Sequence, residues 1–238
     1  MHRSGFVNII GNPNVGKSTL MNALVGEKLS IITSKAQTTR HRIMGIVSGE
    51  DFQIVYSDTP GILKPSYKLQ ESMMKFVTGA VADADVILYV TDTVERGERS
   101  AEIIDRIRQS GVPAIVVINK IDLPSAQPEE VRQEIEDVIG LDASYAPCVS
   151  AKTGLNIDQV LEAVVNYVPA PQGDENAPLQ ALIFDAFYDN YRGAICFIRV
   201  KQGTIRTGMR MRMMATGGEF DICLLYTSPS PRDRQKSR

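Results

Sequence analysis

The fold is decided by one stretch near the N-terminus, Gly11-Asn12-Pro13-Asn14-Val15-Gly16-Lys17-Ser18. It fits the pattern G-x-x-x-x-G-K-[ST], in which glycines let the backbone wrap closely around phosphate oxygens. The apolar run Phe6–Ile10 precedes it, and a helical pattern over Ser18–Val25 follows it. Because a strand before and a helix after confirm such a loop, we favour a phosphate-binding loop over a chance turn. Lys17 is then expected to reach the β- and γ-phosphates, and the Ser18 hydroxyl to bind Mg²⁺.

Outside this loop, strand-like and helical segments alternate, which is typical of βαβ units and a mostly parallel sheet. The sequence predicts an α/β fold, with a P-loop domain over residues 1–170 and a six-stranded sheet. Strands are expected over residues 6–10, 43–47, 52–57, 86–91, 114–119 and 146–149, the second and third forming a hairpin. Helices are expected over residues 18–25, 69–82, 101–109 with Ser100 as N-cap, 129–139 and 157–168.

The pattern changes after the P-loop domain. Residues 171–178 are rich in Pro and polar residues and are predicted to form a linker. Residues 179–222 contain three strand-like stretches without a helix, which predict a partial β-barrel. Residues 223–238 show no periodicity and are rich in Ser, Pro and Arg, so a disordered tail is expected. The net charge of −2 is divided between an acidic part before residue 173 and a basic part after it.

A second motif, Asp58-Thr59-Pro60-Gly61, follows the apolar strand at residues 52–57. A carboxylate at a strand end can hold Mg²⁺ through water, and the Gly61 N–H is placed to sense a γ-phosphate. Alone, such a tetrapeptide is usually just a turn. Its position after the phosphate loop is what gives it weight.

Two further motifs close later strands. In Asn119-Lys120-Ile121-Asp122, the Asp122 carboxylate can accept hydrogen bonds from guanine N1–H and N2–H₂, a donor pair that adenine lacks. Asn119 and the Lys120 stem are expected to brace the loop and the base. In Ser150-Ala151-Lys152, the Ala151 N–H is expected to donate to guanine O6. Taken alone, Ser-Ala-Lys is better explained as a surface turn.

The four motifs together predict guanine-nucleotide binding and Mg²⁺-dependent hydrolysis of GTP to GDP and phosphate. Catalysis would come mostly from positioning and charge stabilisation. Besides the residues quoted above, Thr19 and Ile62 are expected to contact the nucleotide. The metal ligands are expected to be Ser18, Asp58 and a switch threonine.

Composition excludes several other classes of protein. Hydrophobic content of 43% and charged content of 23% are ordinary for a globular chain. The longest apolar runs are strand-length, whereas a transmembrane helix needs about 20 apolar residues. We identify no signal peptide, and three scattered cysteines suit a reducing cytoplasm, the expected location. With only two histidines, histidine-based metal or triad chemistry is not expected.

The order of the motifs resembles that of small GTP-binding domains related to translation factors. Residues 1 to about 118 resemble the Era family of GTPases, which act in small ribosomal subunit assembly. The resemblance rests on GNPNVGKSTLMNAL at 11–24, KAQTTRHRIMGI at 35–46 and SDTPGI at 57–62. It implies that Thr39, with Thr38 as the alternative, is the switch threonine that meets Mg²⁺ and the γ-phosphate. Lys17 and Thr39 would then be the catalytic residues. It also implies a peripheral membrane association.

From about residue 119 to 222 the sequence resembles the LepA family of translation factor GTPases instead. The resemblance rests on NKIDLPSAQPEEVRQEIEDVIGLDAS at 119–144, VSAKTGLNIDQVLEAVV at 149–165 and APLQALIFDAFYDNYRGAICFIRVKQGTIRTG at 177–208. It implies a β-barrel after the GTP-binding domain and an action on assembled ribosomes. Conversely, the first half lacks the His that the LepA family places after Asp-Thr-Pro-Gly, where Ile62 stands here.

We therefore interpret the chain as a hybrid whose junction lies in or near residues 119–122, a motif that both families share. A recombination or a sequence-assembly error would produce it, and a natural hybrid is the alternative. Residues 223–238 resemble neither family. The Era family's RNA-binding KH domain, with its G-x-x-G, does not follow the linker. Ribosome or ribosomal RNA binding is thus implied only by family resemblance.

Two residues bear on the mechanism. Ile62 stands where many GTPases have a water-orienting Gln, so intrinsic hydrolysis should be slow and depend on another group, ion or partner. Asn14 occurs in K⁺-stimulated relatives, which suggests the hypothesis that K⁺ bridges the phosphates and stabilises charge. The alternative, Asn14 as a turn former, is equally favoured.

Four functional interpretations remain open from the sequence. The first is a GTPase of small-subunit assembly, by resemblance to the Era family. The second is a ribosome-dependent translation factor GTPase, by resemblance to the LepA family. The third is a nucleotide-switched binding module with little turnover, in which residues 27–42 and 58–70 recruit a partner. The fourth is a non-biological chimera whose GTP-binding domain folds while its C-terminal part does not.

Overall fold

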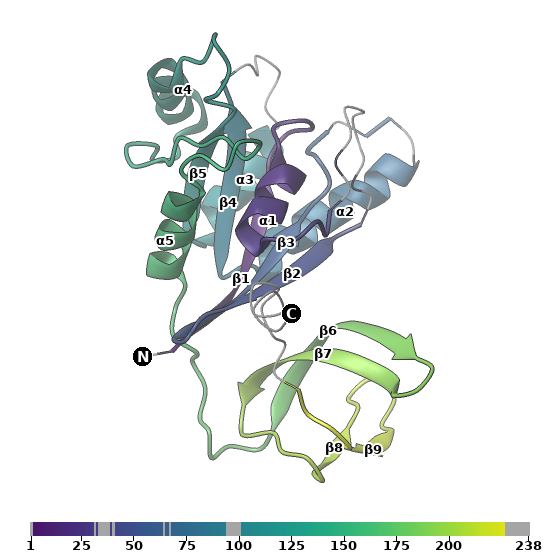
Figure 1. Cartoon of the computed structure of the whole chain (residues 1–238). Coiled ribbons are helices and arrows are strands. Elements are labelled where there is room, and N and C mark those ends of the chain that lie inside the picture. The colour runs from purple at the N-terminus through teal and green to yellow at the C-terminus, as the bar shows by residue number, and fades with distance from the viewer. Residues whose placement is uncertain are drawn as a thin grey trace. The chain divides into compact units, whose positions relative to one another are not determined.

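The structure is a computed structural model that describes residues 2–30, 32, 39, 41–63, 65–66, 68–93 and 101–226. The described chain forms two compact units, with the division between Ala170 and Pro171 (Figure 1). Ser100, Thr38 and residues 227–238, for which the sequence predicts a helix cap, an alternative switch threonine and a disordered tail, lie outside the described residues. Among the described helices, none combines the length and the apolar character needed to span a membrane.

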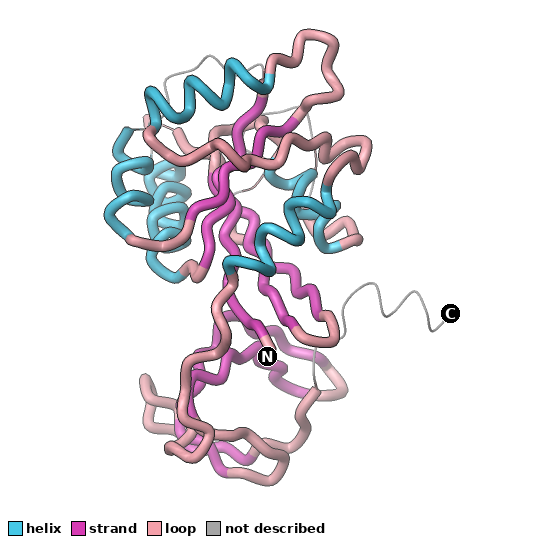
Figure 2. The backbone as a smooth tube through the Cα atoms, turned by 90° about the vertical axis from the view of Figure 1, so that its left-hand side faces the viewer, coloured by secondary structure: helices cyan, strands magenta, loops and turns pink. Residues whose placement is uncertain are grey.

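The first unit is built on a five-stranded sheet in the order β2-β3-β1-β4-β5, with helices on both faces (Figures 1 and 2). β2 is antiparallel to β3, and the other neighbours are parallel. The strands are β1 (Arg3–Ile10), β2 (Ile43–Ser48), β3 (Phe52–Asp58), β4 (Val86–Asp92) and β5 (Ala114–Asn119). The helices are α1 (Lys17–Val25), α2 (Lys68–Asp83), α3 (Ala101–Ser110), α4 (Pro128–Glu134), the π-helix η1 (Ile135–Ile139) and α5 (Ile157–Tyr167). The α/β fold with a mostly parallel sheet is thus confirmed.

The central strands are apolar throughout because both of their faces are covered. Along β4, Leu88 and Val90 belong to one core with α1 and α5, whereas Ile87 and Tyr89 belong to a second core with α2 and α3. The same alternation holds along β5. Each core is therefore formed by every second residue of the strands, as the period-2 geometry of a strand requires.

The sheet differs from the prediction at its edge and in one helix. The sixth strand expected over residues 146–149 is reduced to a single bridge between Ile118 and Cys148. Pro147 explains this, because it accepts a hydrogen bond from Ile118 but has no N–H to extend the ladder. The helix expected over residues 129–139 widens into the π-helix at Ile135, where the Gly140 N–H donates to the Ile135 carbonyl over 2.8 Å.

The topology brings the predicted motifs to one edge of the sheet. The parallel strands β1, β3, β4 and β5 end at Ile10, Asp58, Asp92 and Asn119. The phosphate loop follows β1, and the second and third motifs begin at the last residues of β3 and β5. The fourth motif follows the bridge between Ile118 and Cys148, beside β5. β1 lies between β3 on one side and β4 on the other, so the chain changes direction across the sheet at β1. In open α/β sheets, ligands bind outside the carboxyl ends of the strands at this switch point.

The second unit consists of two antiparallel hairpins. β6 (Gln180–Asp189) pairs with β7 (Gly193–Gln202), and β8 (Arg210–Arg212) pairs with β9 (Glu219–Asp221). The sequence predicted three strands here and missed β9. Between Pro171 and Tyr226 the two hairpins form separate two-stranded sheets, so the described part closes no barrel. Closure requires a sheet with more strands than either hairpin supplies.

Candidate functional site

The phosphate-loop motif connects the end of β1 to α1, as the sequence predicts. A Cβ on Gly11 would lie 2.1 Å from the Val90 carbonyl oxygen, and one on Gly16 would lie 2.2 Å from Asn119 Nδ2. Gly16 also has a φ of +96°, which glycine adopts most readily. The two glycines are thus required because the loop runs directly against β4 and the last residue of β5.

Lys17 lies at the first position of α1 and is only 6% exposed. Its Nζ donates a hydrogen bond to the Asn12 carbonyl over 2.7 Å, so the ammonium lies back across the loop. Asn14, at the exposed tip, has a φ of +66°. This left-handed conformation is what a turn-forming Asn provides. A loop that carries a cation and faces a helix N-terminus is suited to bind phosphate.

Three oxygen-bearing side chains converge beside the start of α1. Ser18 Oγ donates to Asp58 Oδ2 over 2.6 Å, and Thr39 Oγ1 lies 3.3 Å from the same oxygen. Ser18 Oγ and Thr39 Oγ1 are 3.2 Å apart. The three predicted Mg²⁺ ligands are therefore brought together, although they come from α1, the loop before β2 and the end of β3.

The Asp58 carboxyl group supports a metal at this position. Asp58 is fully buried, and its Oδ1 has no hydrogen-bond partner among the described residues. Burial raises the pKa of Asp58, while the Ser18 hydroxyl and the Lys17 ammonium lower it. A buried oxygen without a partner, next to two hydroxyl oxygens, matches the all-oxygen coordination that Mg²⁺ prefers. The residues present therefore fit this ion.

The segment after β3 packs directly on the phosphate loop. Thr59 Oγ1 donates to the Ile9 carbonyl over 2.7 Å, and the Ile62 N–H donates to the Gly11 carbonyl over 3.1 Å. A Cβ on Gly61 would approach Pro13 to 2.8 Å. The Ile62 side chain is 4% exposed and belongs to the core under α2 and α3. In this structure it offers no polar group for an attacking water.

Asn119 joins three of the predicted motifs. Its Nδ2 donates to the Val15 carbonyl over 2.8 Å, and its Oδ1 accepts the Ala151 N–H over 2.9 Å. This differs from the prediction for Ala151, because the N–H expected to donate to guanine O6 is hydrogen-bonded within the protein here. Ser150 is buried, and its Oγ accepts the Thr153 N–H over 3.2 Å. Asp122 and Lys152 are both exposed at this edge.

Two residues near the site were missed by the sequence analysis. Asn22 of α1 accepts the N–H groups of Leu29 and Ser30, each over 2.9 Å, and so anchors the start of the segment that leads to Thr39. Asp92 ends β4 and forms an ion pair with Lys120. The signal for Asp92 was present, since it is a carboxylate at the end of a parallel strand, as Asp58 is.

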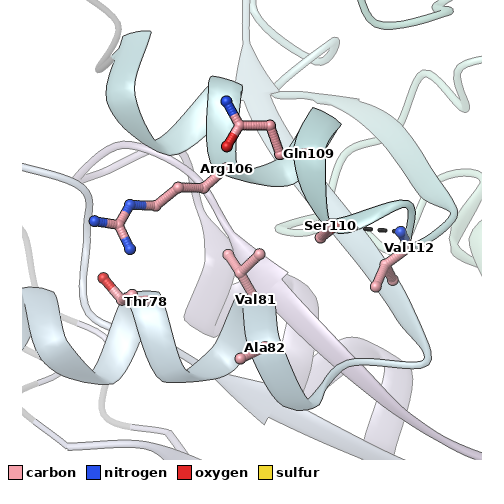
Figure 3. Close-up of a pocket in the computed structure, with 7 residues that line it drawn as sticks. All are labelled: Thr78, Val81, Ala82, Arg106, Gln109, Ser110 and Val112. Atoms are coloured by element: carbon pink, nitrogen blue, oxygen red, sulfur yellow. Dashed lines mark hydrogen bonds between the residues drawn. The ribbon is translucent and has the colours of Figure 1, made fainter.

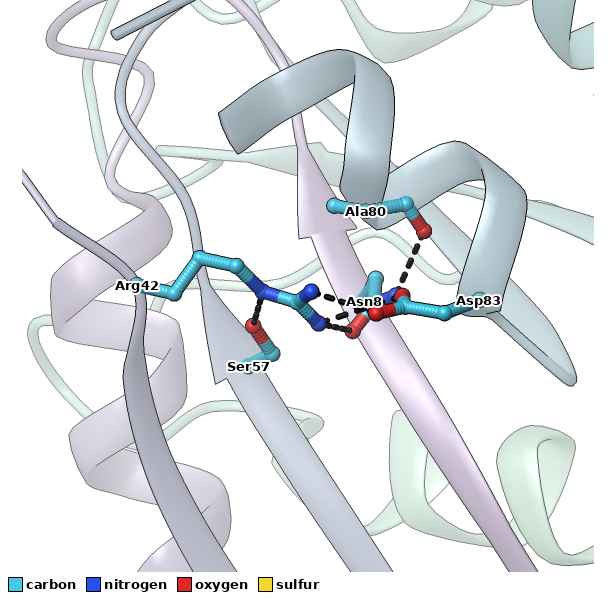
Figure 4. A network of polar contacts seen from close by, with 5 residues as sticks. All are labelled: Asn8, Arg42, Ser57, Ala80 and Asp83. Atoms are coloured by element: carbon cyan, nitrogen blue, oxygen red, sulfur yellow. Dashed lines mark hydrogen bonds and ion pairs between the residues drawn. The ribbon is translucent and has the colours of Figure 1, made fainter. Parts of the chain in front are cut away.

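The far end of the same segment is also anchored, by Arg42 (Figure 4). Its guanidinium donates to Asn8 Oδ1 over 3.1 Å and to Ser57 Oγ over 3.0 Å, and it forms an ion pair with Asp83 at the end of α2. Asn8 Nδ2 in turn donates to the Ala80 carbonyl over 2.5 Å. The chain three residues after Thr39 is thus tied to β1, β3 and α2.

A separate hollow of about 390 Å³ lies between α2 and α3 (Figure 3). It is lined by Thr78, Val81, Ala82, Arg106, Gln109, Ser110 and Val112. None of these residues belongs to the four motifs. The hollow is therefore distinct from the site at the carboxyl edge of the sheet.

The fold and this site define a P-loop GTPase domain. Residues 6–120 match the family model described as 50S ribosome-binding GTPase. The chain is 46% identical over 196 residues to elongation factor 4 of Clostridium botulinum (strain Langeland), a match that covers 82% of this chain and 31% of that protein. With elongation factor 4 of Alkaliphilus metalliredigens it shares 40% identity over 244 residues, covering 94% of this chain and 39% of that protein. The chain thus spans about a third of the length of these relatives.

Solved structures of other GTPases also match this chain. Era of Aquifex aeolicus bound to GDP and AlF₄⁻ has 37% identity and a TM-score of 0.63, covering 71% of this chain and 58% of that chain. Era in complex with MgGDPNP and nucleotides 1506–1542 of 16S ribosomal RNA matches with the same identity and TM-score, covering 72% and 59%. A bacterial selenocysteine-specific elongation factor has a TM-score of 0.66 at 17% identity, covering 93% and 38%, which reflects the fold alone.

Proposed function

We propose that this protein is a translation-factor GTPase that hydrolyses GTP when it binds the ribosome, as the LepA-type interpretation of the sequence holds. One observation carries the proposal: the match to an elongation factor 4 covers 94% of the chain. Because the first unit ends at Ala170, a match of this extent includes residues of both units. The Era structures match only 71% and 72% of the chain.

In this proposal the four motifs bind different parts of one nucleotide. The phosphate loop and Lys17 bind the β- and γ-phosphates, which helix α1 favours through its N-terminus. Ser18, Thr39 and Asp58 would hold Mg²⁺, which supplies charge neutralisation at the phosphates when bound. Asn119, Lys120 and Asp122, with Ser150 to Lys152, bind the guanine base.

The position of Ile62 supports dependence on a partner. Its side chain is apolar and packed in the core, so it cannot orient the attacking water. Hydrolysis by the protein alone is therefore slow, and the group that completes the site comes from the ribosome or from an ion.

The second candidate is the Era-like role in small-subunit assembly. It is supported by 37% identity to Era over 71% of this chain. A hybrid of two GTPase sequences remains part of this candidate. The two candidates differ in the partner that stimulates hydrolysis.

The test measures phosphate release from saturating GTP with whole ribosomes and, separately, with small-subunit ribosomal RNA. The proposal predicts stimulation of about tenfold or more by whole ribosomes and none by the RNA, since activating partners of GTPases supply at least this much. Lys17→Ala controls for contaminating hydrolysis. Stimulation by the RNA alone would favour the Era-like role instead.

A further inference from the structure

The last residue of β4, Asp92, lies beside the predicted guanine-binding loop. In the sheet register Asp92 is opposite Asn119, the last residue of β5. The Asp92 side chain is 5% exposed, and its Oδ2 lies 2.5 Å from Lys120 Nζ. Thr93, the next residue, donates a hydrogen bond from Oγ1 to the Lys120 carbonyl over 3.4 Å. Lys120 is therefore held at its ammonium by the last residue of β4 and at its backbone by the residue that follows it.

The backbone of Lys120 needs such support. Its φ is +64°, in the left-handed region that residues with a side chain seldom adopt. Such a conformation persists where the surrounding structure holds it in place, often at binding sites. It also sets the direction of the chain between Asn119, which bonds the phosphate loop, and Asp122. A change in this turn would move the two groups apart.

We infer that Asp92 is a positioning residue for nucleotide binding: its carboxylate fixes Lys120, and through Lys120 the guanine-binding loop. The inference rests on the proposed binding of a guanine nucleotide and adds a residue that lies outside the four motifs. Asp92 acts through Lys120 and touches no nucleotide itself. The pair is asymmetric: the Asp92 side chain is 5% exposed and the Lys120 side chain 35%. The buried Asp92 carboxylate therefore has its counter-charge in Lys120, and removing either charge deprives the other of this counter-charge.

If the Asp92–Lys120 pair had only a structural role, its loss would change stability and not nucleotide affinity. Removing one partner of a buried pair lowers stability wherever the pair lies in the fold. A positioning role instead couples Asp92 to Lys120 in nucleotide affinity. Asp85, just before the other end of β4, offers a matched control. Its carboxylate accepts the Phe6 N–H over 2.6 Å, far along the strand from the predicted guanine loop.

The experiment is a double-mutant cycle on the full chain with fluorescent GDP as the probe. Asp92→Asn and Lys120→Met are each expected to weaken GDP binding about tenfold, the scale on which partners of ligand-binding groups act. The double variant should bind no more weakly than the weaker single variant, because both remove the same interaction. Asp85→Asn should leave the GDP affinity of the folded protein unchanged.

The outcomes separate this inference from the proposed function. Loss of GDP binding in Asp122→Asn tests guanine binding, whereas the cycle alone tests Asp92. Unchanged GDP affinity in Asp92→Asn, or fully additive effects of the two substitutions, would overturn the inference. If Asp92→Asn does not fold, Asp92→Glu replaces it, since the longer side chain misplaces the carboxylate. The inference then requires weaker GDP binding at an unchanged melting temperature, and unchanged affinity overturns it.

Discussion

The Arg42 guanidinium lies 2.5 Å from the Asp83 carboxylate, joining the chain after Thr39 to the last residue of α2 (Figure 4). The Arg42 side chain is 15% exposed and that of Asp83 is 43% exposed. A pair so close to solvent contributes little by itself. Arg42 contributes to stability mainly through its hydrogen bonds to Asn8 and Ser57, which are both buried.

Arg42→Met is expected to lower the free energy of unfolding by about 1–3 kcal/mol, because the buried Asn8 and Ser57 oxygens lose their donor. Urea denaturation in the absence of nucleotide measures this. Asp105→Asn is the control, since Asp105 and Arg108 form an exposed pair at 3.7 Å. It should cost at most about 0.5 kcal/mol. Equal stability of Arg42→Met and wild type would show that the network contributes nothing.

Asp122→Asn is expected to weaken GDP binding by about 10- to 100-fold and to favour xanthosine nucleotides. An amide group presents a donor where guanine also presents one, whereas xanthine presents an acceptor. Competition titrations with GDP and xanthosine diphosphate measure the change. Unchanged GDP affinity would contradict the role proposed for Asp122.

Asp58→Asn is expected to raise the melting temperature of the nucleotide-free protein at neutral pH in EDTA. Because burial raises the Asp58 pKa above 3.8, the folded state favours the protonated carboxyl group. The buried Asp58 carboxyl group therefore stabilises the fold at pH values below its pKa in the unfolded chain. This stabilisation is lost as the pH rises through the higher pKa of Asp58 in the folded protein. Melting curves of both proteins across this range test it. If Asp58→Asn melts at a lower temperature than wild type at neutral pH, the buried Asp58 charge does not destabilise the fold.

Single-turnover GTP hydrolysis is expected to be about tenfold or more faster in KCl than in NaCl, if K⁺ stabilises charge beside Asn14. Asn14→Gly is the control, because glycine adopts the observed φ of +66° without a side chain. It should hydrolyse GTP at one rate in both salts. Equal rates for the wild type would leave Asn14 as a turn former only.

Local patterns predicted much of the fold and the position of the motifs. The strand–loop–helix context of Gly11 to Ser18 and the motifs at Asp58 and Asn119 were visible because each follows an apolar run. Parallel strands then bring these ends to one edge, which is a property of the topology. The convergence of Ser18, Thr39 and Asp58 agrees with the metal ligands expected from motif and resemblance.

Contacts between distant residues were not predictable in the same way. Arg42 reaches Asp83 only because β2, β3, β1 and α2 pack in that order, which no local pattern encodes. The Asn119 contacts with Val15 and Ala151 depend on the close approach of three loops. The prediction of a sixth strand was wrong for a local reason, since Pro147 has no N–H to donate. Such a residue could have been weighed at the sequence level.

In the proposed function, this carboxyl edge of the sheet binds GTP and hydrolyses it with Mg²⁺. The most direct measurement is phosphate release from GTP and from ATP, with Mg²⁺ and with EDTA, for the wild type and Lys17→Ala. We predict that phosphate is released from GTP and not from ATP, that the release depends on Mg²⁺, and that Lys17→Ala abolishes it. Equal release from ATP, or release from GTP that persists in Lys17→Ala, would show that this site is not a GTPase site.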